Sequence, residues 1–320
     1  MDELVHNSTH KTRLLEKLRR DFGAIALQAL ADPTTIEIML NADGVLWQEC
    51  LGTTMRPIGT MQASRAEAVM RTIATSLDTT ITGKNPMIEG ELPLDGSRFA
   101  GQIPPIVHAP TFAIRKKASA IFSLDRYVEE GIITAKQKRI IADGVCDHRN
   151  ILVVGGTGSG KTTLTNAIIH QMVEENPHER IVIIEDTGEI QCAAKNVIQY
   201  HTTLDVTMMH LLRTTLRMRP DRILVGEVRG PEALDLLMAW NTGHEGGVAT
   251  LHANNAKAGL DRLAMLISMH PESPSPIEPL IGEAVHLIIH ITKTPDGGRK
   301  VQEMREVSGF SGGEYHTRQL

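Results

Sequence analysis

Apolar residues recur with two different spacings along the chain, and the first part of the sequence mixes both. Over residues 9–31, apolar side chains recur every three or four positions with basic residues between them, which predicts an amphipathic helix. Residues 35–40 (TIEIML) alternate and predict a strand, and residues 64–77 predict a second helix with Ser64 as its N-cap. This mixture predicts a smaller α+β domain over residues 1–130.

The pattern changes after residue 150, where short β-branched runs alternate with helical segments. The runs occupy residues 151–154, 181–184, 223–225, 248–251 and 285–291. This alternation is typical of a mainly parallel sheet with helices on both faces. The sequence therefore predicts an α/β domain over residues 131–320, following the α+β domain.

Composition and charge narrow the classes of function. The chain is 41% hydrophobic and 22% charged, which is ordinary for a soluble globular protein. A net charge of -5 and only 3% aromatic residues argue against a nucleic-acid binder, which usually needs a basic surface and stacking faces. Cys50, Cys146 and Cys192 are scattered, so we expect neither a disulfide framework nor a zinc site, and a reducing, cytoplasmic compartment fits best.

Membrane targeting signals are not evident in the sequence. The first residues lack a basic-then-apolar signal, and no unbroken apolar run approaches about 20 residues, the length of a membrane span. We therefore expect no transmembrane segment, while peripheral membrane contact stays open.

The segment LVVGGTGSGKTT, residues 152–163, matches the phosphate-binding pattern G-x-x-x-x-G-K-[ST] between an apolar strand and a helical pattern. Glycines let backbone N–H groups converge on phosphate oxygens, and the following helix points its positive end at the same anion. Lys161 supplies a cation for the β- and γ-phosphates, and Thr162 offers a hydroxyl to Mg²⁺. A glycine-rich turn with a chance lysine is the alternative. The predicted nucleotide-binding residues are Gly155, Gly156, Thr157, Gly158, Ser159, Gly160, Lys161, Thr162 and Thr163.

Carboxylates follow two further apolar strands. Glu185, Asp186 and Glu189 lie just past the strand in IVIIEDTGEI, and Glu227 ends the strand in RILVGEVRG. Because ligands bind at the carboxyl ends of parallel strands, such groups could polarise an attacking water or hold Mg²⁺. The second segment resembles a Walker B strand with glutamate in place of the usual aspartate. Polar capping of surface loops is the alternative for both.

Histidines and arginines provide further candidates. In NTGHEGGVATLHANN, His252 ends a strand and could donate to a γ-phosphate, whereas His244 lies in a glycine-flanked loop. Neither histidine has partners at metal-ligand spacing. Arg213 and Arg217 share a helix face and could reach a neighbouring subunit's phosphates, with a solvated helix face as the alternative.

Four motifs together resemble, in order, those of the secretion (traffic) ATPase family of type II and type IV secretion, in its conjugal-transfer branch. They are GGTGSGKT, IEDTGEI, ILVGEVRG and ATLHANN, and the run over residues 219–247 is highly specific. DGSRFAGQIPP and TFAIRKK resemble segments of the family's N-terminal domain. One departure is Gly247, where relatives more often carry serine or threonine.

The resemblance implies a RecA-like P-loop NTPase core in a cytoplasmic homohexameric ring at the inner membrane. Such a ring would hydrolyse ATP with Mg²⁺ and power a type IV secretion or conjugal-transfer (mating-pair, pilus) machine. Its partners would be inner-membrane machinery proteins, without sequence-specific nucleic acid. The alternatives are a nucleotide-gated assembly scaffold with incidental hydrolysis, a DNA-stimulated motor and a small-molecule P-loop kinase.

The resemblance also implies roles for particular residues. Glu185 would be the leading candidate to activate water, with Asp186 and Glu189 as alternates. Glu227 would support Mg²⁺ together with Thr162. Two further roles lie outside these carboxylates: His252 would sense the γ-phosphate, and Arg98 and Arg115 would approach the phosphates from the N-terminal domain.

Overall fold

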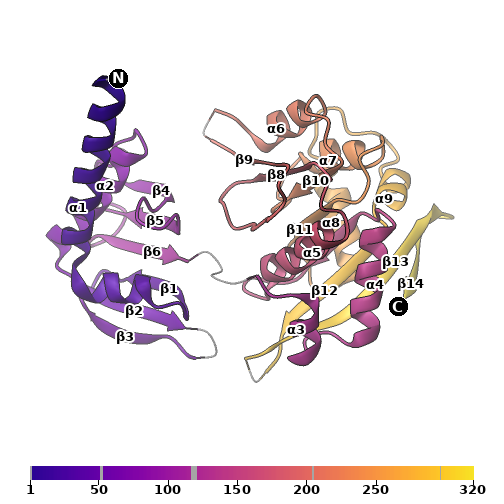
Figure 1. The fold of residues 1–320 in the computed structure, drawn as a ribbon, viewed down its shortest axis with the longest axis horizontal. Helices are drawn as coiled ribbons and strands as arrows, with labels where there is room; N and C mark the ends of the chain where they lie inside the picture. Colours follow the sequence, from indigo (N-terminus) through magenta and orange to yellow (C-terminus); the bar gives the residue numbers. More distant parts are fainter. Residues whose placement is uncertain (1, 51–52, 117–120, 204, 296) are drawn as a thin grey trace. The chain divides into compact units, whose positions relative to one another are not determined.

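The computed structural model divides the chain into two compact units, Met1–Ser119 and Ala120–Leu320 (Figure 1). It describes residues 2–50, 53–116, 121–203, 205–295 and 297–320. The division falls before the boundary expected at residues 130 and 131. The reason is that helix α3 (Leu124–Glu129) buries Leu124 and Tyr127 in the core of the second unit.

The first unit is an antiparallel sheet packed against two helices. The six strands pair in the order β3-β2-β1-β6-β5-β4. Ile38 and Leu40 on one face of the sheet are buried against apolar residues of both helices. The elements are α1 (Asp2–Ala31), β1 (Thr35–Leu40), β2 (Val45–Cys50), β3 (Arg56–Thr60), α2 (Ala63–Ser76), β4 (Met87–Glu91), β5 (Arg98–Gln102) and β6 (Thr111–Arg115).

Two details of the helices in this unit differ from the sequence prediction. The helix expected over residues 9–31 is present, but Gly23 has a φ of 74° and breaks it into two helices that meet at a kink. Helix α2 begins at Ala63, and its N-cap is Gln62, which makes no side-chain capping hydrogen bond. The prediction of Ser64 as the N-cap is therefore wrong, because the helix already includes that residue.

The second unit contains an eight-stranded sheet in the order β14-β13-β12-β7-β11-β10-β8-β9. The strands from β12 to β9 in this order are all parallel, and β13 and β14 add an antiparallel edge. The strands are β7 (Ile151–Val154), β8 (Ile181–Glu185), β9 (Val197–His201), β10 (Arg222–Val225), β11 (Val248–Leu251), β12 (Leu287–Lys293), β13 (Arg299–Ser311) and β14 (Glu314–Gln319).

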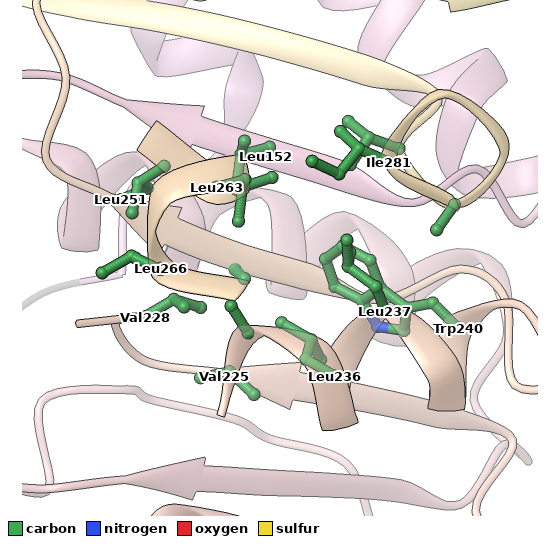
Figure 2. Packing of buried hydrophobic residues seen from close by; sticks show 14 of the residues in the cluster. Leu152, Val225, Val228, Leu236, Leu237, Trp240, Leu251, Leu263, Leu266 and Ile281 are labelled. Carbon is green, nitrogen blue, oxygen red and sulfur yellow. The ribbon is translucent and has the colours of Figure 1, made fainter. Parts of the chain in front are cut away.

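Helices cover both faces of this sheet. Leu152 and Val154 point from β7 into a core formed with α6 (Met208–Thr215), α7 (Ala233–Trp240), α8 (Ala256–Ile267) and α9 (Glu278–Ala284). Figure 2 shows part of that core, where Leu237 and Trp240 pack near Leu263 and Ile281. The alternate residues of β7 point to the other face, which is covered by α3, α4 (Ala135–Cys146) and α5 (Lys161–Glu175). No helix in the described ranges is both long and apolar enough to span a bilayer.

Parallel pairing brings the sequence motifs to one edge of the sheet. The glycine-rich loop follows β7, the acidic motif follows β8, Glu227 follows β10 and His252 follows β11. These four strands are neighbours in the order β7-β11-β10-β8 and run in the same direction. Their carboxyl ends therefore meet, which is where ligands bind in open α/β sheets.

The amino end of β10 carries a buried arginine. Arg222 is fully buried, forms an ion pair with Glu179 and donates hydrogen bonds to the carbonyls of Gly246 at 2.9 Å and Val145 at 3.0 Å. A buried guanidinium is tolerated only when its donors are satisfied. Arg222 thereby fixes the loop before β11 against the end of α4.

The same loop explains why glycine occupies position 247. Asn150 Oδ1 accepts hydrogen bonds from the backbone N–H of Gly246 and of Gly247, and the fully buried Trp240 donates its indole N–H to the carbonyl of Ile223 at 3.1 Å. A Cβ at position 247 would lie 2.2 Å from Trp240 Nε1 and 2.3 Å from that carbonyl oxygen. The indole therefore fills the space that a serine or threonine side chain would need.

We expect Gly247→Ala to lower the free energy of unfolding by about 1–3 kcal/mol, the usual cost of overpacking a core. Gly144→Ala is the matched control, because its Cβ would meet nothing closer than 3.7 Å and it lies within helix α4. The control should be unchanged or slightly more stable. Urea unfolding followed by circular dichroism measures both, and equal stability of the two variants would contradict this account of position 247.

Candidate nucleotide-binding site

The glycine-rich loop between β7 and α5 forms the base of the candidate site. Gly158 and Gly160 have φ angles of 67° and 96°, in the left-handed region that favours glycine. Gly155 is crowded, since a Cβ there would lie 2.3 Å from the carbonyl oxygen of Ile291. Gly156 has no heavy atom within 4 Å of its ideal Cβ position. The loop is thus closely packed on one side and open at Gly156.

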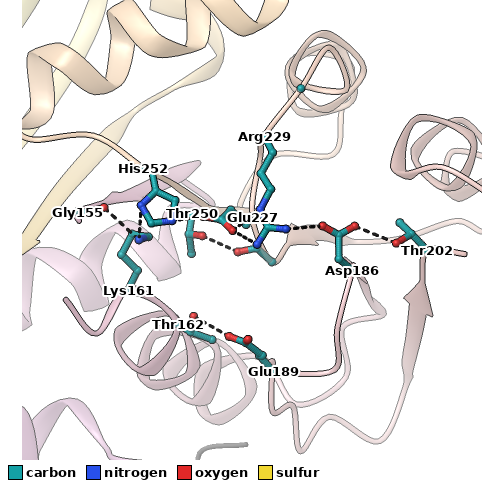
Figure 3. Close-up of polar contacts among 12 residues, drawn as sticks. Gly155, Lys161, Thr162, Asp186, Glu189, Thr202, Glu227, Arg229, Thr250 and His252 are labelled. Atoms are coloured by element: carbon teal, nitrogen blue, oxygen red, sulfur yellow. Dashed lines mark hydrogen bonds and ion pairs between the residues drawn. The ribbon is translucent and has the colours of Figure 1, made fainter. Parts of the chain in front are cut away.

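Lys161 begins helix α5 and turns back over the loop. Its side chain is buried, and Nζ donates to the carbonyl oxygens of Gly155 at 3.0 Å and Gly156 at 3.1 Å (Figure 3). The same atom lies 3.3 Å from His252 Nδ1. Phosphate oxygens are stronger acceptors for an ammonium than neutral carbonyls. The lysine can therefore exchange these partners for a phosphate without leaving the loop.

Glu185, at the end of β8, holds the acidic loop in place. Its side chain is 3% exposed, and Oε2 accepts hydrogen bonds from the backbone N–H of Glu189 at 2.8 Å and of Ile190 at 3.0 Å. Its other oxygen lies 3.7 Å from His201 Nε2. The carboxylate therefore satisfies the buried N–H of Ile190, whereas the N–H of Glu189 also donates to the carbonyl oxygen of Thr187 at 2.6 Å.

Glu189, rather than Glu185, lies against the hydroxyl expected to bind the metal. Thr162 Oγ1 donates to Glu189 Oε2 at 3.3 Å (Figure 3). Asn166 on α5 donates to the carbonyl oxygen of Glu189 at 3.2 Å and accepts from the backbone N–H of Gln191 at 3.1 Å. Asn166 thus holds the loop against helix α5. It was not among the predicted site residues, because an asparagine inside a helix carries no motif signal.

Glu227 contacts two basic side chains, Arg229 and His252. Arg229 Nε donates to Glu227 Oε2 at 2.5 Å, and His252 Nε2 lies 2.7 Å from Glu227 Oε1. Arg229 also donates to Asp186 Oδ2 at 3.1 Å, and Asp186 accepts from Thr202 Oγ1 at 2.9 Å (Figure 3). Arg229 therefore links two predicted motifs, a role that its position in the sequence did not indicate.

The site offers few protein ligands for a metal ion. Across the described ranges, no group of three or more His, Cys, Asp or Glu side chains is placed to hold one. Mg²⁺ usually keeps several waters and binds one or two protein ligands together with substrate phosphates. The Thr162 hydroxyl, with Glu189 beside it, suits that limited role. Glu227 follows β10, which is the neighbour of the strand that precedes Glu189, β8.

The arginines predicted from the N-terminal domain belong to a row of charges across the first unit's sheet. Glu49, Glu37, Arg115 and Arg98 are successive register partners on β2, β1, β6 and β5. Burial raises the pKa of Glu37, Arg115 opposes that shift, and Glu49 adds to it. Like charges directly opposite each other are unfavourable, and here each arginine also has a glutamate as its register partner on the other side, Glu37 for Arg115 and Glu91 for Arg98.

Arg213, weighed as an arginine finger, has a partner within its own unit. Its Nε donates to Asp235 Oδ1 at 2.8 Å, and this hydrogen bond raises the pKa of the guanidinium. Asp235 also lies 3.3 Å from the Nε2 atom of the buried His270. Arg213 thus ties α6 to α7, whereas Arg217 lies exposed beyond the end of α6.

Comparisons with known proteins agree with the motifs. The family described as Type II/IV secretion system protein matches residues 47–311. A probable conjugal transfer protein TrbB of Sinorhizobium fredii is 47% identical over 303 residues, which cover 95% of this chain and 92% of that relative. The resemblance to the conjugal-transfer branch is therefore confirmed.

Solved structures agree on the fold. The ATPase DotB of Legionella pneumophila has a TM-score of 0.64 at 20% identity, over 88% of this chain and 79% of DotB. The pilus retraction motor PilT with bound ADP has a TM-score of 0.60 at 21% identity, over 92% of this chain and 80% of PilT. These similarities confirm the mixed α/β class.

We expect Glu185→Ala to destabilise the acidic loop, because the buried N–H of Ile190 would lose its acceptor. An unsatisfied buried donor costs about 1–3 kcal/mol. Glu185→Gln is the control, since its amide oxygen can still accept both hydrogen bonds. Hydrogen exchange at Ile190 should accelerate in the alanine variant and stay slow in the glutamine variant, whereas the N–H of Glu189 keeps its hydrogen bond to Thr187 and should change less. Unchanged protection in the alanine variant would show that the carboxylate does not hold the loop.

Proposed function

The chain belongs to the Type II/IV secretion system protein family, and on that premise we propose that it hydrolyses ATP to power a type IV secretion or conjugal-transfer machine. One observation carries the proposal: the ends of three neighbouring strands, β7, β11 and β10, bring Lys161, Thr162, Glu227 and His252 to one edge of the sheet. The TrbB relative is described as a conjugal transfer protein, DotB as an ATPase and PilT as a motor with bound ADP.

In this proposal the glycine-rich loop holds the polyphosphate of ATP. Lys161 exchanges the carbonyls of Gly155 and Gly156 for β- and γ-phosphate oxygens. The N–H groups at the start of α5 add a positive dipole end. Mg²⁺, when bound, would neutralise charge that develops on the phosphates, with the Thr162 hydroxyl as its protein ligand and Glu227 in support.

Glu189 is the better candidate for the group that activates water. A general base must reach the proton that it removes. Glu185 is buried and already accepts two backbone N–H groups, whereas Glu189 is half-buried and contacts the hydroxyl of Thr162. We therefore assign Glu185 to positioning the loop and Glu189 to water. Glu185 was the leading candidate from sequence, with Glu189 as an alternate.

His252 is suited to report on the γ-phosphate. Its Nδ1 lies 3.3 Å from Lys161 Nζ and its Nε2 lies 2.7 Å from Glu227. A change in the partners of Lys161 would therefore reach Glu227 through one imidazole ring. Arg229 extends the same chain of contacts to Asp186.

The assembly proposed is a homohexameric ring with RecA-like cores in the cytoplasm, peripheral to the inner membrane. Arg98 and Arg115 would approach the phosphates from the N-terminal domain, and nucleotide binding and release would draw the two units together and let them part. Inner-membrane machinery proteins would receive this motion. The net charge of -5 supports a motor that does not itself track along nucleic acid.

Lys161→Ala should lower the rate of ATP turnover by roughly a hundredfold or more, because the phosphates lose the buried ammonium group at the glycine-rich loop. Lys257→Ala is the control, since Lys257 is an exposed lysine on α8. Phosphate release measures turnover, and circular dichroism checks that the fold is intact. Full turnover in Lys161→Ala would remove the proposed nucleotide site.

The same assay separates the alternatives. Phosphate release without any acceptor molecule would exclude a small-molecule kinase. Turnover that rises steeply with added single-stranded or duplex DNA would favour a DNA-stimulated motor instead.

Glu189→Gln should lower kcat by roughly a hundredfold and leave the Kd for ATP nearly unchanged, because the variant loses a base and keeps a hydrogen-bonding side chain. Glu185→Gln, which keeps the loop anchored, should retain most of the activity. The reverse ranking of the two variants would return the water-activating role to Glu185. Full conjugal transfer by a Glu189→Gln variant that cannot hydrolyse ATP would favour the nucleotide-gated scaffold.

A further inference from the structure

Two cations from outside the four motifs lie against the glycine-rich loop. Lys293 ends β12 and Arg299 begins β13. A Cβ at Gly158 would lie 3.0 Å from Lys293 Nζ. A Cβ at Gly160 would lie 2.7 Å from Arg299 Cδ and 3.0 Å from its Nε. The loop therefore makes room for these two side chains.

Strand pairing explains how residues so far along the chain arrive there. Strand β12 is the parallel neighbour of β7, so its carboxyl end lies beside the start of the loop, and Ile291 O closely approaches Gly155. Strand β13 returns antiparallel to β12, and Lys293 and Arg299 are direct register partners at the end of the pairing.

This pair places two like charges next to each other at the end of the β12–β13 pairing. Like charges directly opposite each other on neighbouring strands are unfavourable. Within residues 2–50, 53–116, 121–203, 205–295 and 297–320, neither side chain forms an ion pair, and the buried Arg299 Nε has no hydrogen-bond partner. With the positive end of α5 and Lys161 nearby, the region accumulates one sign of charge, which is typical of a site for a polyanion.

We propose that Lys293 and Arg299 form a cationic arm of the nucleotide site and contact the polyphosphate of the bound nucleotide. This inference rests on the proposed function and adds two phosphate-binding residues to it. Arginine can bind two phosphate oxygens at once through its planar fork, whereas lysine acts as a mobile point charge. Because the contact is to phosphates, the arm should not distinguish adenine from guanine.

The test measures the Kd of the full-length chain for ATP, GTP and inorganic tripolyphosphate by calorimetry. Lys293→Gln and Arg299→Gln should each weaken all three ligands by about tenfold, the effect of losing one charge-assisted contact. The affinity of both variants for these ligands should also depend less on salt concentration than that of the unsubstituted chain. Lys300→Gln is the control, because Lys300 is exposed and follows Arg299 on the alternate face of β13. Arg299→Met, which keeps the apolar stem over Gly160, should match Arg299→Gln.

The outcomes are distinguishable. An unchanged Kd for every ligand in both glutamine variants would overturn the cationic arm. A loss of affinity for ATP and GTP with unchanged affinity for tripolyphosphate would also overturn it, because the contact would then be to the base or ribose. Lys161→Ala is measured in parallel. Loss of binding in Lys161→Ala alone would support the proposed function and contradict the arm, whereas no binding by the unsubstituted chain would contradict both.

Discussion

Parallel pairing of β7 with β11 and β12, and of β10 with β8 and β11, is the constraint on which the candidate site depends. Residues that are far apart in sequence meet because their strands end at the same edge. Each strand in this group is buried on both faces, as its continuous apolar run requires. The polar residues that follow these apolar strands therefore lie together at the carboxyl edge of the sheet, where short loops leave them accessible to a ligand.

Buried polar side chains in the second unit hold its loops in place. Glu185, Arg222 and Asn150 are each almost fully buried, and each satisfies backbone groups of a loop beside the sheet. Such groups are costly to bury without partners, so the loops that they hold are well defined. The residues expected to meet substrate, such as Glu189 and His252, are more exposed. The buried polar residues therefore hold loops in place, and the more exposed ones are available to contact a ligand.

The sequence predicted the parts of the fold that carry a strong pattern. All five β-branched runs became strands of the second unit, because full burial leaves an unmistakable apolar run. Strand β9 and the β13–β14 pair were not predicted, since they lie at the edges of the sheet and carry many polar side chains. The motif located Lys161 and Thr162. It could not separate Glu185 from Glu189, because only the folding of the loop back onto β8 decides which carboxylate accepts its N–H groups. Lys293 and Arg299 carry no motif at all, and only the strand order brings them against the glycine-rich loop.

The contact between Gly247 and Trp240 has a consequence for how this lineage can change. The indole occupies the volume that a side chain at position 247 would take, so the two positions are coupled by epistasis. A serine at position 247 would fit without strain only once a smaller residue had replaced the tryptophan. The order of those two substitutions is therefore constrained, and in the reverse direction the tryptophan could enter only where position 247 was already glycine.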